Sequence, residues 1–475
     1  MLSGKTILFV RICGTGVSSA ALFAQRMGAR VIGTDSAYYP PISDSLKGAG
    51  IAENPLADTI AIIEREKSDL IVVGNALWGK SPEAAYILSC GIPYYSMPSF
   101  LEEFLIPGHR SVVVAGTHGK TTTTTLIAEF LASVGKKPSY MIGGIPLFSM
   151  TNASFEKDGY FVIEGDEYDT AFFDKGPKFL HYRPDIGIVT SIEFDHADIY
   201  ASLEAIFESF RKFTGIISKK CILNIDFPNN RRLLDLYPRE LFFTYSVTDK
   251  SADLFARRTG SDGRLMKFRV TVNGREGEEF KSPLFGDQNL MNLAALMAFV
   301  HNELPSLDHA TVAGAIAGMK GVKRRQEFLG NLNGAPVYSD FAHHPTAVRY
   351  TFDSFRSLFG HKRYIVVFDP ATNSNARNIF EAEYAKLFAD ADLFFIGKPA
   401  KATGLSEEER FNPERLCENI NRVKGYPAAR HLPEADQIIE ALKAEADKES
   451  VVIVMSNGGF GGFFGKLAPY LTVSR

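Results

Sequence analysis

The residues whose types and spacing most clearly suggest chemistry lie at 110–131, RSVVVAGTHGKTTTTTLIAEFL. An apolar run leads into a glycine loop at 116–119, and Lys120 and Thr121 then begin a stretch with helical periodicity. The backbone N–H groups of such a loop, and the N-terminus of the helix behind it, favour a phosphate group. A lysine here adds a charge for the outer phosphates, and a threonine hydroxyl can bind Mg²⁺. This stretch predicts a nucleoside-triphosphate site.

The loop departs from the usual pattern G-x-x-x-x-G-K-[ST]. Val114 stands where the first glycine is expected, and Gly116 supplies the early turn instead. An ordinary strand-to-helix turn is the alternative interpretation. Glycine, lysine and threonine directly after an apolar strand are more typical of a variant phosphate-binding loop.

Acidic residues follow two later strands that we expect at 160–163 and 186–191. The chain continues as EGDEYD at 164–169 after the first strand and as EFDHAD at 193–198 after the second. Parallel α/β sheets bind ligands at the carboxyl ends of their strands, and Mg²⁺ accepts carboxylate oxygens there. We therefore predict a metal site. A solvated acidic loop is the alternative, and His196 could be a ligand or a structural histidine.

The first hundred residues contain a second glycine turn that follows a strand. A strand at 6–12 leads into Gly14 and Gly16, a helix at 17–27 follows, and the next strand ends at Asp35. This resembles the dinucleotide pattern G-x-G-x-x-G, but Ser19 occupies the third glycine position. The pattern favours a nucleotide-diphosphate site, and a nicotinamide-dinucleotide site remains the alternative.

Strands that alternate with helices recur along the whole chain. Further strands are expected at 70–74, near Tyr94, within 219–283, and at 364–368, 393–396 and 451–455. Such alternation indicates α/β domains with parallel, doubly wound sheets. Because 475 residues exceed what one core supports, we expect three domains, at 1–109, 110–325 and 326–475.

Two further segments carry polar groups suited to a nucleotide. GDQNLMN at 286–292 turns into a helix that presents Asn289 and Asn292 one turn apart, where amides could contact adenine or cap the helix. The adjacent Arg324 and Arg325 follow at a domain junction, where they could reach phosphate or form a solvated basic turn.

Composition excludes several classes of protein. The chain is 45% hydrophobic and 23% charged, with a net charge of −3, so we expect no nucleic-acid partner. The four cysteines form no CxxC pair, which argues against a zinc site or a disulfide framework. The first residues lead into a strand rather than a signal peptide, and no apolar run approaches the roughly 18–20 residues of a membrane span. We expect a cytoplasmic protein.

Taken together, the motifs resemble the Mur ligases, the ATP-dependent amide-forming enzymes of cell-wall peptide synthesis. The resemblance covers essentially the whole chain, and its motifs are AGTHGKTTTT at 115–124, EGDEYD, EFDHAD, GDQNLMN, KRR at 323–325 and DFAHHP at 340–345. It implies a UDP-binding Rossmann-like domain, a central ATPase and a C-terminal Rossmann-like domain that binds the incoming peptide. It also implies ATP and two Mg²⁺ ions.

The resemblance assigns roles to individual residues. It implies catalytic roles for Lys120, Glu164 and His196, and metal binding by Thr121, Glu164 and His196. The implied ATP site consists of Gly116, Thr117, His118, Gly119, Lys120, Thr121, Thr122, Asn289, Arg325, Asp340 and His343. The implied UDP site consists of Gly14, Thr15, Gly16, Asp35 and Asn75, and Arg377 would contact the peptide.

Within the family, the chain looks most similar to the branch that joins UDP-N-acetylmuramate to L-alanyl-γ-D-glutamyl-meso-diaminopimelate. The stretches 165–200 and 96–104 carry this similarity. Three positions depart from family patterns: Gln288 replaces a histidine, Ala371 replaces an arginine, and Arg211 stands where some branches use a lysine. A ligase that adds L-alanine, or a nucleotide-binding regulator without ligase activity, are the alternatives. The sequence leaves the oligomeric state open.

Overall fold

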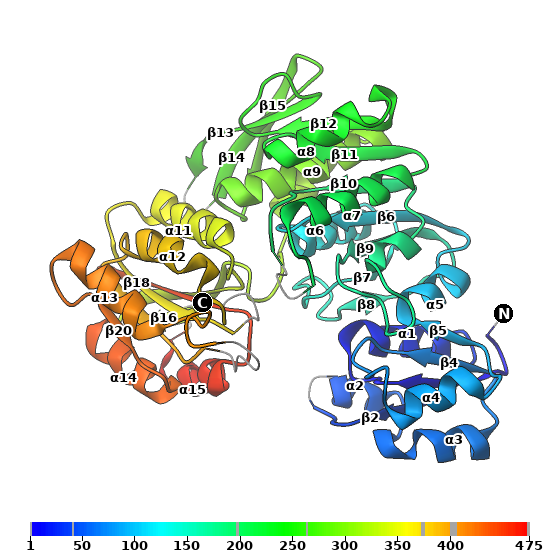
Figure 1. Ribbon diagram of the computed structural model, residues 1–475. Helices are drawn as coiled ribbons and strands as arrows, with labels where there is room; N and C mark the ends of the chain where they lie inside the picture. Colours follow the sequence, from blue (N-terminus) through cyan, green and yellow to red (C-terminus); the bar gives the residue numbers. More distant parts are fainter. Residues whose placement is uncertain are drawn as a thin grey trace.

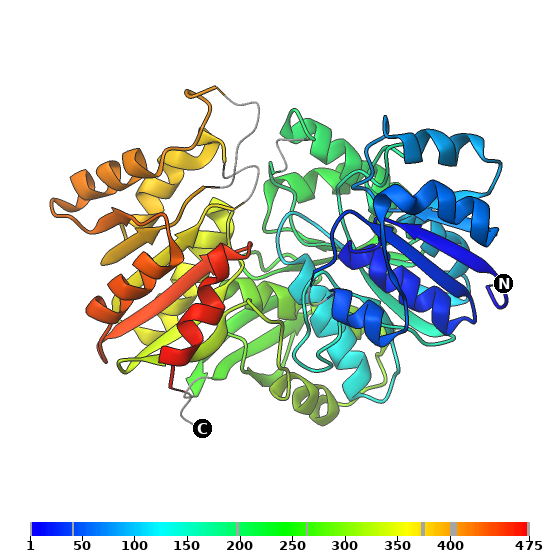
Figure 2. The same cartoon turned by 90° about the horizontal axis from the view of Figure 1, so that it is seen from below.

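The computed structural model describes residues 2–39, 42–195, 199–262, 265–371, 376–399 and 406–472. These residues form three α/β parts, each built on its own sheet. Figure 1 and Figure 2 show the N-terminal part (blue) and the C-terminal part (yellow to red) on opposite sides of the part that holds the glycine loop (cyan to green). The predicted three-domain α/β architecture with mainly parallel sheets is confirmed.

The N-terminal sheet has five parallel strands in the order β3-β2-β1-β4-β5. Its strands are β1 (Thr6–Val10), β2 (Arg30–Asp35), β3 (Glu53–Pro55), β4 (Leu70–Val73) and β5 (Tyr94–Ser96). Its helices are α1 (Thr15–Arg26), α2 (Ile42–Gly48), α3 (Thr59–Glu66), α4 (Pro82–Ser89) and α5 (Met97–Phe104). The strand order reverses between β1 and β4, and ligands of open α/β sheets bind at such a point.

The middle sheet has ten strands in the order β15-β14-β13-β12-β11-β10-β6-β9-β7-β8. Its parallel centre is β6 (His109–Ala115), β7 (Ser139–Met141), β9 (Gly159–Gly165), β10 (Ile186–Val189), β11 (Lys220–Asn224) and β12 (Phe242–Ser246). The remaining strands are β8 (Ala153–Ser154), β13 (Leu254–Asp262), β14 (Leu265–Val272) and β15 (Arg275–Ser282). Its helices are α6 (Lys120–Ser133), α7 (Leu203–Gly215), α8 (Pro228–Arg231), α9 (Asp287–Glu303) and α10 (His309–Ala317).

The C-terminal sheet has six strands in the order β16-β17-β21-β18-β19-β20. They are β16 (Glu327–Leu332), β17 (Ala335–Asp340), β18 (Arg363–Asp369), β19 (Leu393–Ile396), β20 (Ala429–His431) and β21 (Ser450–Ser456). Helices α11 (Pro345–Phe359), α12 (Glu381–Phe388) and α13 (Pro413–Lys424) pack on one face, and α14 (Ala435–Glu445) and α15 (Phe463–Leu467) pack on the other.

Strand β6 and helix α6 are both buried in the core of the middle part. Residues Val112 to Ala115 are fully buried, because helices cover both faces of a parallel sheet. Helix α6 is buried along most of its length, from Thr122 to Leu131, since it lies between the sheet and α9. Among the described residues, no helix combines the length and apolarity that a membrane crossing requires.

Candidate active site

The loop at 116–119 joins the central strand β6 to helix α6, as the sequence predicts. Gly116 has φ +143°, and a Cβ there would lie 2.0 Å from Thr190 Oγ1. Gly119 has φ +83°, and a Cβ there would lie 2.8 Å from Asn292 Oδ1. Both positions therefore require glycine. Val114, at the expected first glycine position, is a core residue of β6, so the turn begins later than in the usual loop.

The segment after β10 fixes the shape of this loop. Thr117 N–H donates to Ser191 O at 2.8 Å, and His118 N–H donates to Ser191 Oγ at 2.9 Å. Helix α6 begins directly behind at Lys120, so its first N–H groups, which have no partner within the helix, face the loop. Thr122 lies in the same turn. Rigid walls and a helix N-terminus together make a site for phosphate.

Lys120 lies at the bottom of this site. Its Nζ donates to both carboxylate oxygens of Glu167, at 2.9 and 3.0 Å, and to Gly116 O at 2.6 Å. Burial alone would lower the pKa of Lys120, but the negative charges of Glu167 and Asp166 outweigh this effect and hold it above its usual value. Lys120 therefore stays positively charged in the interior, where its attraction for phosphate is least screened.

Two of the predicted metal ligands lie next to each other. Thr121 Oγ1 donates to Glu164 Oε2 at 3.0 Å, and Glu164 Oε1 accepts from Gly143 N–H at 2.6 Å. Oxygen ligands on neighbouring corners of an Mg²⁺ octahedron are about 3.0 Å apart, so this pair fits the ion. Burial raises the pKa of Glu164, because desolvation outweighs the Gly143 N–H bond and the positive charges of Lys120 and Arg325. His196, the third predicted ligand, lies outside the described residues.

The two acidic segments flank the glycine loop because β9 and β10 are the two direct neighbours of β6. Glu164 is the penultimate residue of β9, and Glu193 follows β10. Arg211, at the position where some Mur ligases use a lysine, is exposed on α7 and pairs with Glu208, so it takes no part in this site.

A cleft of about 690 Å³ connects this site to the N-terminal part. Lys120 and Glu164 line it on one side. All five residues of the predicted UDP site line it on the other: Gly14, Thr15, Gly16, Asp35 and Asn75. They gather at the reversal between β1 and β4, with the N-terminus of α1 facing the cleft. The cleft thus places an anion-binding helix end and the phosphate loop around one space.

Asp35 shapes the N-terminal wall of the cleft. Its Oδ2 accepts from Cys13 N–H at 2.8 Å, and its Oδ1 lies 3.1 Å from Arg11 Nη1. Gly16 packs closely on α5, since a Cβ there would lie 2.7 Å from Met97 Cε. The carboxylate of Asp35 therefore holds the turn before α1 in place, in addition to lining the cleft.

The other side of the loop faces the C-terminal part through a cavity of only about 30 Å³. Five predicted ATP residues from the first turn of α6 or from other segments line it: Thr121, Thr122, Asn289, Arg325 and Asp340. Asn289 Nδ2 donates to Gln326 Oε1 at 3.0 Å, and Gln326 N–H donates to Asp340 Oδ2 at 2.9 Å. Gln288 lines the same cavity.

His343 and its neighbour His344 take different positions. His343 Nδ1 contacts Phe341 O at 3.0 Å within the C-terminal part. His344, which the sequence did not single out, caps α11 by accepting from Thr346 N–H at 3.3 Å. Its ring centre lies 4.7 Å from that of His118 in the glycine loop. A histidine directly before a proline that begins a helix is the signal that could have identified this cap.

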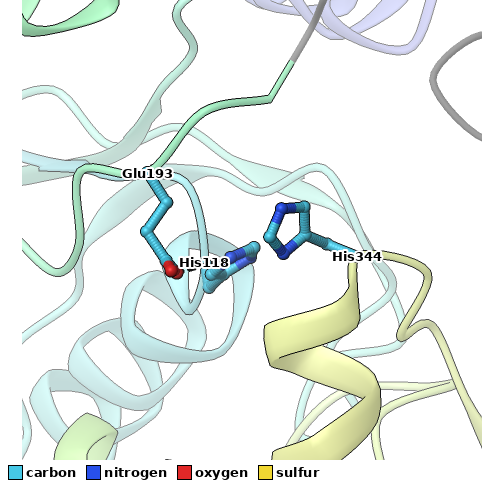
Figure 3. Close-up of side chains that lie close together, drawn as sticks. All are labelled: His118, Glu193 and His344. Carbon is cyan, nitrogen blue, oxygen red and sulfur yellow. Dashed lines mark ion pairs between the residues drawn. The ribbon is translucent and has the colours of Figure 1, made fainter. Parts of the chain in front are cut away.

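His118, Glu193 and His344 form a cluster of ionisable groups between the two parts, and Figure 3 shows them converging from the loop, the segment after β10 and the start of α11. His118 Nε2 lies 3.0 Å from Glu193 Oε2, and Thr346 Oγ1 donates to Glu193 Oε1 at 3.1 Å. Burial, reinforced by the charge of His118, lowers the pKa of His344 to about 4. The contact is therefore formed with a neutral His344.

Arg377 directly precedes a short 3₁₀ helix (Asn378–Phe380) and forms an isolated bridge with Arg410. Among the described residues, it does not belong to the lining of either the cleft or the small cavity. Ala371 precedes it at the carboxyl end of β18, and residues 372–375 lie outside the described part of the chain.

Comparison with known proteins agrees with this geometry. Three family descriptions match consecutive segments: "Mur ligase family, catalytic domain" at 6–107, "Mur ligase middle domain" at 114–300, and "Mur ligase, glutamate ligase domain" at 324–458. Together they include the N-terminal glycine turn, the phosphate loop and the C-terminal sheet.

Similar proteins match over almost the full length. The UDP-N-acetylmuramate–L-alanyl-γ-D-glutamyl-meso-2,6-diaminoheptandioate ligase of Escherichia coli K12 is 32% identical over 96% of both chains. A UDP-N-acetylmuramate–L-alanine ligase of Lacticaseibacillus casei is 31% identical over 83% of this chain and 85% of its own.

Solved structures give the same result. A murein peptide ligase from Psychrobacter arcticus has a TM-score of 0.69 at 31% identity, covering 99% of this chain and all of the other. A UDP-N-acetylmuramate–alanine ligase from Thermotoga maritima, at 21% identity, shares the fold with a TM-score of 0.77 over 98% of each chain. Because both sequence and structure match along the whole chain, this protein belongs to the Mur ligase family of ATP-dependent amide ligases.

Proposed function

We propose that this chain joins the lactyl carboxylate of UDP-N-acetylmuramate to the amine of L-alanyl-γ-D-glutamyl-meso-diaminopimelate, with conversion of ATP to ADP and phosphate. The reaction belongs to cytoplasmic recycling of peptidoglycan fragments. The observation that carries the proposal is the single cleft in which Thr15, at the start of α1, and Lys120 line opposite walls. The choice of the tripeptide rests on the near full-length similarity to the Escherichia coli ligase.

The three parts of the chain divide the substrates among them. Residues 1–109 bind the UDP moiety, with the N-terminus of α1 and Gly14, Thr15 and Gly16 at the diphosphate. Residues 110–325 bind ATP, and residues 326–475 bind the peptide. A substrate that carries a diphosphate at one end and a carboxylate at the other can then span the cleft from α1 to Lys120. Its length places the reacting carboxylate at the γ-phosphate.

The chemistry proceeds in two balanced steps. An oxygen of the lactyl carboxylate attacks the γ-phosphorus of ATP, the bond to ADP breaks, and an acyl phosphate forms. The neutral amine of the peptide then attacks the acyl carbon, phosphate leaves with the former carboxylate oxygen, and the amine proton is released. Lys120 offsets the charge that builds up on the γ-phosphate oxygens. To do so, Lys120 must first exchange its bond to Glu167 for one to phosphate.

Metal binding is assigned to Thr121 and Glu164, with His196 as the ligand of a second ion. Mg²⁺ bound there would neutralise the phosphate oxygens and reduce repulsion between the anionic substrates. Within the chain, Glu164 is oriented by Gly143 N–H, and Thr121 is fixed by the first turn of α6. Asn289, Arg325, Asp340 and His343 contact the nucleotide from the C-terminal side.

A paired assay tests the proposal. The purified chain is incubated with UDP-N-acetylmuramate, ATP and Mg²⁺, and either the tripeptide or L-alanine is supplied in parallel. Mass spectrometry of the UDP products should show tripeptide addition. Addition of L-alanine alone would assign the chain to the alanine ligases, which the similarity to the Lacticaseibacillus enzyme makes the second candidate. Phosphate release without any ligated product would contradict both.

A further inference from the structure

Two neighbouring arginines on the linker between the middle and C-terminal parts point to different places. Arg325 lies 4.5 Å from the centre of the Phe341 ring, and Asp340 and Glu164 are the carboxylates whose charges it experiences. It lines the small cavity beside the phosphate loop. Arg324 lies 5.6 Å from the same ring and 4.9 Å from the Phe464 ring. Its guanidinium therefore reaches into the C-terminal part rather than toward the phosphate loop.

The surroundings of Arg324 are the carboxyl ends of two neighbouring strands. Its Nη2 donates to Ser456 O at 2.5 Å, and to Ser456 Oγ and Gly458 O at 3.0 Å each. Ser456 ends β21 and pairs with Asp369, the last residue of β18. Helices α11 and α12 pack on one face of the sheet, whereas α14, which leads into β21, packs on the other face. The strand order therefore reverses between β18 and β21. This is the position at which open α/β sheets bind ligands.

The charge of Arg324 has no direct counterpart there. In the described part of the chain, the charges of Asp369, Glu327 and Asp340 act on its guanidinium, but none of these carboxylates forms an ion pair with it, and Nη2 donates to neutral oxygens. Asp369 is reached only through Ser456 Oγ, which donates to Asp369 Oδ2 at 2.7 Å. Arg324 Nε is buried without a hydrogen-bond partner. Arg324 is half-buried. Charges withdrawn from water are normally paired, so a guanidinium without an ion-pair partner at a ligand-binding edge indicates an anionic ligand.

The wall opposite Arg324 is small. Ala371 follows β18, and a Cβ on Gly458 would lie 2.8 Å from the Ala371 Cβ. Ala371 therefore lies beside the same carbonyl that Arg324 contacts. Ala371 brings no charge to this edge, whereas the guanidinium of Arg324 lies there and can meet an incoming anion.

We propose that Arg324 binds a carboxylate of the amine-bearing substrate and holds it at the carboxyl ends of β18 and β21. This inference rests on the proposed function, but it requires only an amine substrate with a carboxylate, which a peptide and a free amino acid both possess. The linker then carries one arginine for each side of the reaction. Arg325 faces the nucleotide, and Arg324 faces the amine substrate. The fork of N–H donors in arginine suits a carboxylate in a way that a lysine does not.

The test compares Arg324→Gln and Arg324→Lys with wild type and with Arg356→Gln. Arg356 is the matched control, since it is an arginine of the same part of the chain that pairs with Asp390 at the surface. The Michaelis constants for peptide, UDP-N-acetylmuramate and ATP are measured separately, together with thermal unfolding. We expect Arg324→Gln to raise KM for the peptide about 10- to 100-fold, the usual loss for a hydrogen bond to a charged group. Arg324→Lys should give a smaller increase.

The KM values for the other two substrates should stay within about twofold, and Arg356→Gln should match wild type. If Arg324 only fastens the linker to β21, its replacement will change all three KM values together or lower the unfolding temperature without a selective effect. Either result overturns the inference.

A second measurement stays informative even if Arg324→Gln fails to fold. Peptides in which one carboxylate at a time is converted to an amide are tested on wild type and on Arg324→Lys. One amide should weaken binding to wild type markedly and to Arg324→Lys less, because Arg324→Lys has already weakened the same contact and the two losses then do not add. Additive losses for every carboxylate would refute the contact. If wild type ligates no amine substrate at all, the proposed function fails; if it ligates normally and these contrasts are missing, only the role of Arg324 fails.

Discussion

The phosphate loop has two sides, and they differ in how much space they leave. Toward the N-terminal part, a cleft of about 690 Å³ separates α1 from Lys120. Toward the C-terminal part, cavities of only about 20 to 30 Å³ remain, and side chains such as His118 and His344 are already in contact. The open side is suited to a long, preformed substrate. The closed side is suited to groups that must part before a nucleotide or an amine can enter.

The contacts that join the N-terminal and C-terminal parts to the middle part differ in whether they involve the phosphate loop. The N-terminal part contacts the middle part beside the cleft rather than at the phosphate loop. His181 lies 2.8 Å from Glu102 and 3.0 Å from Asp174, Ser96 donates to Asp174, and Asn152 Nδ2 donates to Ser19 Oγ in the cleft lining. The C-terminal part is attached at the loop itself, through His118, Glu193 and Thr346. Movement of the C-terminal part would therefore alter the phosphate loop directly.

Lys120 lines the open side, and its neighbours Gly119 and Thr121 line the closed side, so the loss of Lys120 should have the largest effect. Lys120→Ala removes the buried cation at the γ-phosphate, and we expect kcat to fall about 10²- to 10³-fold, as for other groups that stabilise transition-state charge. The measurement is ligation rate at saturating concentrations of all substrates. Lys178→Ala, which removes the lysine that pairs with Asp166 in the same cleft, is the comparison. An equal loss in both variants would show that charge in the cleft matters, but not the position of Lys120.

Replacement of Asp35 tests the open side of the loop, toward the N-terminal part, without changing the closed side. Asp35→Asn weakens the bonds to Cys13 N–H and to Arg11 that fix the turn before α1. We expect KM for UDP-N-acetylmuramate to rise about tenfold, because hydrogen bonds to charged groups contribute roughly 1.5–3 kcal/mol. The KM for ATP should stay unchanged. An equal rise in the KM for ATP would mean that substrate binding on the two sides of the loop is coupled, which would contradict their structural separation.

His344 tests the closed side through pH. Its pKa is about 4 in the folded protein and near 6.5 when exposed, so the unfolded chain binds more protons between these values. Stability contributed by neutral His344 is therefore present above about pH 6.5 and is lost as pH falls toward about 4, by on the order of 3 kcal/mol. Asn can also cap α11, so His344→Asn should flatten the pH dependence of unfolding without removing the cap.

Urea unfolding at a series of pH values measures this effect. The control is His361→Asn, which replaces an exposed histidine beyond the end of α11. The pH profile of His344→Asn should differ from wild type between about pH 4 and 6.5, and that of His361→Asn should not. Parallel profiles for wild type and His344→Asn would contradict a neutral, buried His344 at the contact.

Local sequence patterns predicted the open side well. Strand, glycine turn and helix are encoded within about twenty residues around Lys120, and the structure has β6 and α6 there. The same holds for Gly14, Thr15 and Gly16 before α1. The acidic strand ends flank the loop, one on each side, because β9 and β10 are the neighbours of β6. Each of these predictions required only periodicity and the geometry of parallel sheets.

The closed side could not be predicted in this way, because its contacts join residues far apart in sequence. His343 was singled out from the pair, whereas His344 is the one that meets His118. Glu167 was one of several acids, and only the fold shows that it holds Lys120. Arg324 was expected to reach phosphate or to form a solvated basic turn, yet its guanidinium contacts Ser456 and Gly458, about 130 residues away along the chain.

We propose that ATP phosphorylates the lactyl carboxylate in the open cleft, beside Lys120, before the amine attacks. UDP-N-acetylmuramate with ¹⁸O in both oxygens of its lactyl carboxylate tests this most directly. After ligation in the presence of ATP and the tripeptide, mass spectrometry should find one ¹⁸O in the released phosphate and one in the new amide. Unlabelled phosphate, or label in AMP, would contradict the account.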